Sequence, residues 1–108
     1  MTTANEAHFD NYTVMEVPVM IDPTGKGRHL ELIITDGLCR FKIDGWGDIG
    51  DDLYKTIKKG DEVSLVCTMM SWRGGIKLPN GGVLTDAAGR QVLRTNVSFS
   101  IVRTKEDE

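Results

Sequence analysis

The chain has 108 residues, a formal net charge of −3 and a sequence pI of about 5.3, with 40% hydrophobic and 6% aromatic residues. This length suits one small domain with a modest core and hardly a second domain. A net negative charge argues against a protein that binds polyanions over its whole surface. Any basic surface therefore has to come from one part of the chain. Twelve glycines against three prolines predict many tight turns, as in an all-β protein.

The N-terminal part combines a polar segment with one predicted strand. Residues 1–10 predict a flexible N-terminus in which Phe9 is a candidate anchor. Alternating side chains predict a strand over Tyr12–Met20, with a bend or an edge position at Pro18. The Pro- and Gly-containing residues 22–27 predict a loop.

The next two strands are expected to form a hairpin. Alternation predicts one strand over His29–Thr35 and another over Leu38–Gly45, joined by the two-residue turn signal Asp36-Gly37. The side chains expected in the core are Leu30, Leu32, Ile34, Cys39, Phe41 and Ile43. Both cysteines, Cys39 and Cys67, lie in apolar runs and are expected to be buried thiols in a reducing compartment.

A change of period predicts one helix after this hairpin. Ile49, Leu53 and Ile57 are spaced i, i+4, i+8, which forms one apolar stripe on a helix. Asp48 is the expected N-cap, and Gly60 is expected to end the helix.

The last part of the chain predicts two strands separated by a long excursion. The strands span Glu62–Met70 and Gln91–Arg103, and the Gly-rich residues 71–90 between them predict a long hairpin. The expected inward side chains of the last strand are Leu93, Thr95, Val97, Phe99 and Ile101.

The order β-β-β-α-β-β is typical of an all-β, five-stranded OB-fold barrel with one short helix between strands 3 and 4. An open sheet or a sandwich with the helix outside has the same order and remains an alternative. We expect one OB domain over residues 11–104 and a short acidic C-terminal tail over residues 105–108.

The charges are distributed unevenly along this order. Residues 1–63 hold 7 Lys/Arg and 12 Asp/Glu, a net charge of −5, whereas residues 64–105 hold 6 Lys/Arg and 1 Asp, a net charge of +5. The three residues 106–108 are all acidic. The second segment can therefore form a basic patch, although ordinary solvated strand residues would give the same count.

Catalytic and cofactor signals are weak. Gly45–Gly50 matches the phosphate-binding pattern GxGxxG, but three aspartates within residues 48–52 would repel a phosphate, so we expect these glycines to serve a tight turn. His8 and His29 are the two histidines, and neither belongs to a recognisable catalytic set. We therefore expect no enzyme activity, no cofactor and no metal site.

Trp72 is the strongest candidate for ligand binding, because it stands beside Arg73 just before the Gly-rich excursion. An exposed aromatic ring among cations offers an unpaired base a stacking surface and its backbone a counter-charge. The alternative is that Trp72 packs under the hairpin. The other candidate nucleic-acid contacts are Arg73, Lys77, Arg90, Arg94, Arg40, Lys42 and Trp46. For Trp46, a place in the core is the favoured interpretation, and a contact with nucleic acid is the alternative.

The segments Cys39–Leu53 and Ile57–Val66 resemble the bacterial and phage single-stranded DNA-binding protein family. That family has a strand, a Trp/Phe-Gly turn, a short helix and a strand that starts with Lys-Gly-Asp-x-Val, as Lys58–Val63 does here. Its later parts are an aromatic residue, a Gly-containing turn and a last strand, which Trp72 and residues 86–102 resemble.

The resemblance covers residues 12–103 and has two exceptions. The excursion over residues 73–88 is longer than the family's usual turn. The family's long tail with an aromatic end is missing, which puts recruitment of replication or repair enzymes through such a tail in doubt.

The resemblance implies a homo-oligomeric protein that binds single-stranded DNA with little sequence preference in replication, recombination or repair. RNA is an alternative ligand, and dimer and tetramer are both open. Two other classes stay open: an OB-fold adaptor that binds only protein, and a small enzyme. Without a signal peptide or a spanning apolar run, we expect a cytoplasmic protein of a bacterial cell or a phage-infected host.

Overall fold

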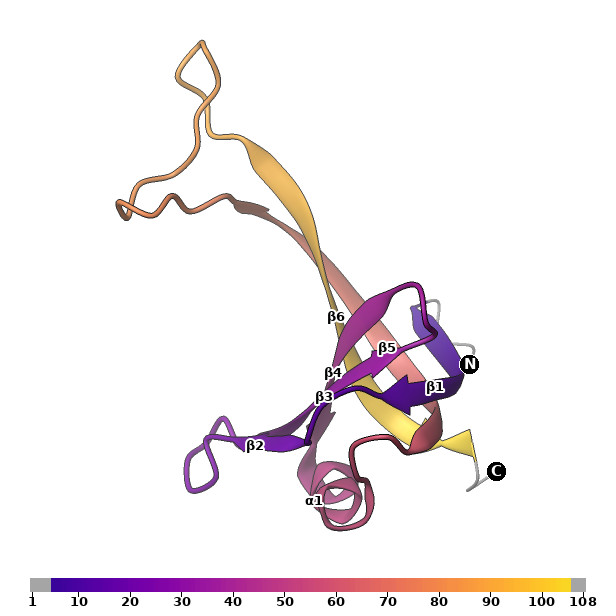
Figure 1. The fold of residues 1–108 in the computed structure, drawn as a ribbon. Helices are drawn as coiled ribbons and strands as arrows, with labels where there is room; N and C mark the ends of the chain where they lie inside the picture. Colours follow the sequence, from indigo (N-terminus) through magenta and orange to yellow (C-terminus); the bar gives the residue numbers. More distant parts are fainter. Residues whose placement is uncertain (1–4, 106–108) are drawn as a thin grey trace.

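The computed structural model describes residues 5–105 and consists of a barrel, one helix and a long projecting hairpin (Figure 1). The elements are β1 (Glu6–Val14), β2 (Val19–Ile21), β3 (His29–Thr35), β4 (Arg40–Trp46), α1 (Gly47–Thr56), β5 (Glu62–Gly75) and β6 (Leu93–Thr104). No helix in the described part of the chain is long and apolar enough to cross a membrane.

The strands close into one barrel. Their order is β1-β5-β6-β4-β3-β2, and an additional pairing of β1 with β3 joins the two ends. β1 and β2 pair with β3 at Ile34 and Glu31 respectively, so together they form one interrupted barrel strand. β4 and β6 run parallel where Ile43 lies beside Phe99. The predicted five-stranded OB barrel with one helix is therefore confirmed.

Alternation along the strands builds the core. Leu30, Leu32 and Ile34 of β3 are fully buried, whereas the residues between them are only partly covered. Phe9 lies at the centre of an aromatic cluster and contacts Phe41 and Phe99 edge-on, with ring centroids 5.2 and 5.1 Å apart. Burial of each such side chain stabilises the fold by about 1.5–3 kcal/mol.

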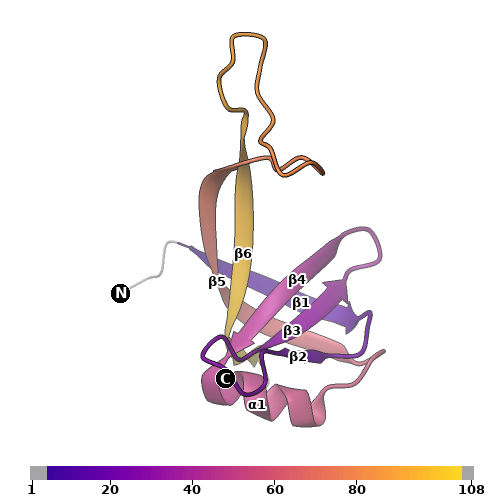
Figure 2. The same cartoon turned by 90° about the vertical axis from the view of Figure 1, so that its left-hand side faces the viewer.

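The helix lies across one end of the barrel (Figure 2). Its predicted apolar stripe of Ile49, Leu53 and Ile57 packs against the core. A Cβ atom on Gly50 would lie 2.2 Å from the carbonyl oxygen of Gly45, so this crossing of helix and strand requires glycine. The GxGxxG pattern thus serves close packing at these two positions, and the expected tight turn is limited to Gly47, whose φ is +66°.

The ends of the domain differ from the prediction. Residues 6–10 belong to β1 and Phe9 is only 4% exposed, so the expectation of a flexible N-terminus is wrong for them. The first strand ends at Val14 instead of spanning Tyr12–Met20, and pairing resumes only in β2 at Val19, after Pro18, which has no N–H to donate. Inside β1, Asn11 has a φ of 58° where the register with β5 shifts. Residues 1–4 and the acidic residues 106–108 of the predicted tail lie outside the described residues.

The helix boundaries also differ. The helix starts at Gly47 with Trp46 as N-cap and no side-chain cap, so Asp48 is not the cap but lies in the first turn. It ends at Thr56, before the predicted stop at Gly60. Gly60, with a φ of +93°, instead forms a turn in which its N–H donates to the carbonyl of Val14.

The β5–β6 hairpin continues far beyond the barrel (Figures 1 and 2). We call residues 70–98 the arm: its strands pair regularly from Met70–Ser98 to Gly75–Leu93, and two isolated bridges hold the outer loops. Leu93 and Val97 are about half exposed, so the expectation that these side chains and Thr95 face a core is wrong. No second layer covers the arm among the described residues, which explains the difference.

Candidate nucleic-acid interface

One continuous outer face connects the barrel to the arm. On β4, Lys42 and Trp46 point outward because Ile43 and Gly45 between them are buried. Asp44 lies on the same outer side and pairs with Ser100 of β6. Side chains two residues apart on a strand share a face, so the outer side of β6 leads from Ser100 along the arm.

Trp72 and Arg94 share this outer face on the arm. Trp72 pairs with Asn96, and Arg94 pairs with Gly74, so all four residues lie on one side of the hairpin. A Cβ atom on Gly74 would lie 3.9 Å from the indole nitrogen of Trp72, which shows that the ring leans over this bare backbone. Trp72 is 50% exposed, so it does not pack under the hairpin.

Arg73 projects from the other side of the arm. It pairs with Thr95, one residue away from the Trp72–Asn96 pair, and successive residues of a strand point to opposite faces. Lys77 and Arg90 lie beyond the regular ladder. The structure therefore brings Trp72 and Arg94 together and separates them from the other three predicted cations of the arm.

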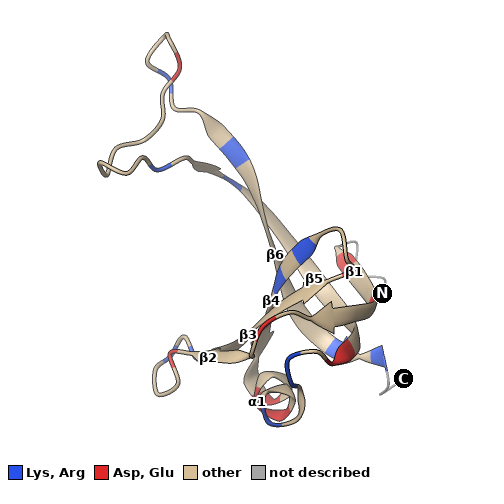
Figure 3. Cartoon of the chain, in the orientation of Figure 1, with Lys and Arg blue, Asp and Glu red and all other residues tan. Residues whose placement is uncertain are grey.

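The arm is the basic part of the molecule (Figure 3). Residues 70–98 hold Arg73, Lys77, Arg90 and Arg94 against the single acidic residue Asp86. Arg90 is paired, with its Nε 3.3 Å from Asp86 Oδ2. The other three cations form no ion pair with any residue between 5 and 105 and are free to contact phosphates.

The cations of the barrel face have acidic neighbours. A guanidinium nitrogen of Arg40 lies 3.7 Å from a carboxylate oxygen of Glu16, and Lys42 Nζ lies 3.7 Å from Glu31 Oε2. Both basic side chains are more than half exposed, so these pairs contribute at most about 1 kcal/mol. A phosphate can therefore compete for either cation.

Trp46 is 46% exposed, so the favoured expectation of a place in the core is wrong. Its ring stacks on the imidazole of His29, with centroids 4.3 Å apart and an interplanar angle of 22°. His29 Nδ1 lies 2.7 Å from the carbonyl oxygen of Gly27, which fixes the imidazole in place. The pair thus presents a second, pre-oriented aromatic surface on the outer face.

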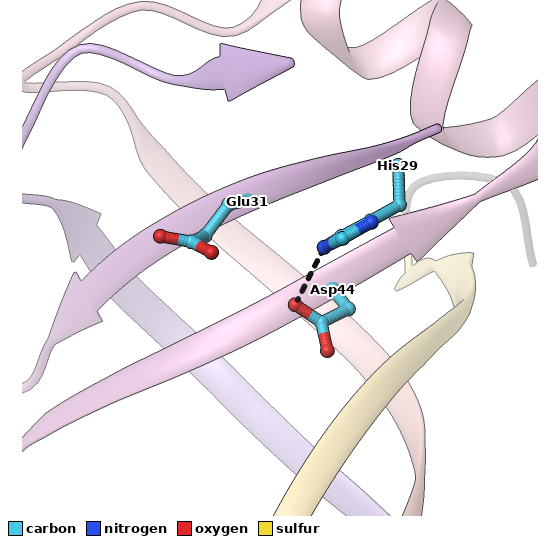
Figure 4. Close-up of side chains that lie close together, drawn as sticks. All are labelled: His29, Glu31 and Asp44. Atoms are coloured by element: carbon cyan, nitrogen blue, oxygen red, sulfur yellow. Dashed lines mark ion pairs between the residues drawn. The ribbon is translucent and has the colours of Figure 1, made fainter. Parts of the chain in front are cut away.

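His29 also belongs to a cluster with Glu31 and Asp44 that the sequence did not reveal (Figure 4). Asp44 Oδ1 is buried and has no hydrogen-bond partner among the described residues. Burial raises the pKa of Asp44, while the charges of Lys42 and His29 act in the opposite direction. The alternation of β3 and β4 indicates that these side chains point outward. The predicted two-residue turn, however, pairs Glu31 with Lys42, whereas the structure pairs it with Asp44.

Comparison with known proteins supports the fold. No family model and no curated protein matches the sequence. Among solved structures, the SSB domain of a Synechococcus sp. protein is similar, with a TM-score of 0.62 and 16% identity over 96% of this chain and 97% of that chain. The mitochondrial single-stranded DNA-binding protein Rim1 of S. cerevisiae is similar with a TM-score of 0.65 and 13% identity, over 97% and 95%. The chain thus has the OB fold of these SSB domains.

Proposed function

We propose that this protein binds single-stranded DNA with little sequence preference, as a component of replication, recombination or repair. The observation that carries the proposal is a half-exposed tryptophan, Trp72, beside the unpaired Arg94 on an arm without a core. A ring in this position can stack on any base, while the neighbouring guanidinium can contact the backbone phosphate. The names of the similar structures, an SSB domain and a single-stranded DNA-binding protein, point in the same direction.

The remaining contacts come partly from the outer face of the barrel and partly from the other side and the outer loops of the arm. Trp46 offers a second stacking surface on the barrel, and the other phosphate contacts come from Arg73, Lys77, Arg90, Arg40 and Lys42. Each stacked base contributes about 1–3 kcal/mol, and each phosphate contact adds to the salt dependence of binding. Base stacking and phosphate contacts carry little sequence information, which fits binding with little sequence preference and leaves RNA as a competitor.

The test is fluorescence anisotropy of a labelled dT oligonucleotide of about 30 residues at about 50 and 200 mM salt. Trp72→Ala should weaken binding by about 5- to 150-fold, which corresponds to one lost stacked base, and Trp72→Phe should retain most of the affinity. Val97→Ala is the matched control, because Val97 is equally exposed on the opposite side of the arm.

Two results would contradict this proposal. Absence of binding at micromolar protein would exclude single-stranded DNA as the ligand. Equal losses in Trp72→Ala and Val97→Ala would show that the arm matters only for folding. Competition with unlabelled RNA of the same length distinguishes the two nucleic acids.

An adaptor function is the second candidate, and one feature favours it. A groove of about 660 Å³ lies between α1 and the start of β5, with Ile49, Leu53 and Val63 along its apolar side. Asp52, Asp61 and Glu62 also line it. This groove suits a basic, partly apolar peptide and repels DNA. Peptide binding without any salt-sensitive DNA binding would favour the adaptor.

We also propose that the protein forms a homo-oligomer and acts in the cytoplasm of a bacterial cell or a phage-infected host. Towards its N-terminal end, β1 pairs with β5 on one edge, and it reaches β3 only through Thr13 and Val14. The other edge of residues 6–10 is thus open to a strand of a second copy. Sedimentation velocity at micromolar concentration tests this, and a monomer at all concentrations would contradict it.

A further inference from the structure

Three potential metal ligands meet on the outer face of β3 and β4 (Figure 4). One ligand atom each from His29, Glu31 and Asp44 lies within 4.8 Å of the others. His29 Nε2 and Asp44 Oδ1 are 3.7 Å apart. Two ligands on one tetrahedral zinc ion are separated by about 3.3–3.6 Å, since each lies about 2.0–2.2 Å from the metal. Small rotations of the side chains would therefore suffice.

The imidazole is oriented as a metal ligand requires. In the neutral tautomer, His29 Nδ1–H donates to the carbonyl of Gly27 at 2.7 Å, which leaves the lone pair of Nε2 facing Asp44. Metal-ligating histidines almost always donate their other N–H in this way. Stacking on Trp46 further restricts rotation of the ring.

The carboxylate of Asp44 lacks the partner that such burial normally requires. Its Oδ1 is buried and accepts no hydrogen bond from any described residue, and 3.7 Å to His29 is too long for one. An unsatisfied buried oxygen destabilises the folded state, and a bound cation would offset this cost. Lys42, which lies 3.7 Å from Glu31, is 58% exposed and can swing away from the cluster.

We propose that His29, Glu31 and Asp44 bind a divalent first-row transition metal ion such as Zn²⁺. One imidazole and two carboxylates suit Zn²⁺ and its neighbours better than Mg²⁺ or Ca²⁺, which prefer all-oxygen sites. Three protein ligands leave a fourth position for water or for a phosphate oxygen.

A bound ion would also change the charge of the outer face. Asp44 lies beside Ser100, where the barrel face continues into the arm, so its carboxylate and that of Glu31 interrupt the basic face. An ion there would neutralise both carboxylates and attract a DNA phosphate. This consequence, unlike the metal site itself, rests on the proposed function.

The site is tested without DNA. Isothermal titration with Zn²⁺ should give one ion per chain. In a Trp72→Phe background, Trp46 is the single tryptophan of the chain, and its contact with His29 means that Ni²⁺ should quench its emission saturably. Asp44→Asn and His29→Gln should each weaken Zn²⁺ binding by at least about tenfold, since even partners outside the ligand shell are worth that much.

His8→Gln is the matched control. His8 pairs with Glu6 at 2.7 Å but belongs to no group of three potential ligands among the described residues, so Zn²⁺ binding should be unchanged. Absence of binding up to millimolar Zn²⁺, or binding that persists in both Asp44→Asn and Glu31→Gln, would overturn the site. Asp44→Asn removes a buried charge and keeps the shape, so it provides a folded variant if His29→Gln unfolds.

The effect of the metal ion on nucleic-acid binding is measured separately. In the anisotropy assay, Zn²⁺ should strengthen dT binding several-fold over EDTA-treated protein, and Asp44→Asn should remove this response. Zinc binding by a protein that binds no DNA would refute the proposed function and leave the metal site standing. DNA binding without zinc binding would refute the metal site alone.

Discussion

At the scale of single residues, Gly50 decides whether the helix can lie on the barrel. An added methyl group would meet the carbonyl oxygen of Gly45 at 2.2 Å, a backbone atom that cannot move aside. Gly50→Ala should therefore lower the free energy of unfolding by about 1–3 kcal/mol, although alanine is by itself the better helix former. Urea denaturation measures this change. Asp52→Ala on the exposed side of α1 should change it by at most about 0.5 kcal/mol, and equal stability of both variants would contradict the close contact.

The two cysteines should react differently. Cys67 is fully buried and burial raises the pKa of its thiol to about 12, whereas Cys39 is exposed in the β3–β4 turn and not in the core as predicted. Native protein should therefore release one equivalent of thionitrobenzoate from Ellman's reagent quickly, and denatured protein two. Cys39→Ser should abolish the fast reaction. A fast reaction in that variant would place Cys67 at the surface.

Asp36 gives the β3–β4 turn a pH dependence. Its Oδ1 accepts the N–H groups of Cys39 and Leu38, both at 2.8 Å, and these bonds hold the pKa of Asp36 below its usual range. A lowered pKa in the folded state contributes stability that is fully present above the ordinary pKa of aspartate and is lost as the pH falls through the folded value. Thermal denaturation should show Asp36→Ala less stable than wild type at pH 7, with the difference shrinking towards pH 2. A constant difference would contradict these hydrogen bonds.

At the scale of elements, the β3–β4 turn shows which feature could not be predicted from the sequence. Alternation correctly identified the inward residues of β3 and β4, because a one-residue error would have buried charged side chains. It could not count the residues in the turn. With the predicted two-residue turn Glu31 would face Lys42, whereas the observed four-residue turn over 36–39 places Glu31 opposite Asp44 and His29 opposite Trp46. The aromatic stack and the acidic cluster both follow from this shift.

The arm could be predicted as a long hairpin but not as a projecting one. Its alternating Val97 and Leu93 have the pattern of a half-buried strand, and the pattern cannot reveal that no other layer covers them. The exposure of Trp72 follows from the same absence of a covering layer. For Trp46, the position at the end of a core strand favoured burial. Gly45 faces inward, against Gly50 of α1, so the next side chain, that of Trp46, points outward.

The arm should be dispensable for folding and required for full affinity. Replacing residues 73–95 with Asn-Gly keeps the Trp72–Asn96 pair next to a favoured two-residue turn and removes no core residue. The thermal midpoint should change little. The variant loses Arg73, Lys77, Arg90 and Arg94, so the slope of log affinity against log salt should fall by up to about 3, at about 0.7 per phosphate contact.

Two outcomes would contradict this role of the arm. An unfolded variant would show that the arm stabilises the barrel, and an unchanged salt slope would show that its cations do not contact phosphates. Arg94→Gln alone should reduce the slope by less than about 1, which provides an internal scale.

At the scale of the whole molecule, the basic charge is concentrated on the part that projects from the barrel. The molecule extends over 52 Å in its longest direction against 34 and 30 Å in the others. Acidic residues predominate in the first part of the chain, and the basic excess lies on the arm (Figure 3). Under the proposed function, the basic, core-free arm meets the nucleic-acid strand while the acidic barrel supports it, so the net negative charge does not prevent binding of a polyanion.

If a strand follows the outer face from Trp46 to Trp72, its length should decide which tryptophan it reaches. In Trp72→Phe and Trp46→Phe variants, the remaining tryptophan reports on the barrel and on the arm respectively. An oligonucleotide of about 5 dT should quench one of the two variants much more than the other at equal saturation, and one of about 20 dT, longer than a single OB-fold site, should quench both. If the short and the long oligonucleotide quench both variants equally, the two tryptophan rings do not lie along one path of the bound strand. Quenching of Trp72 alone by the long oligonucleotide would confine the interface to the arm.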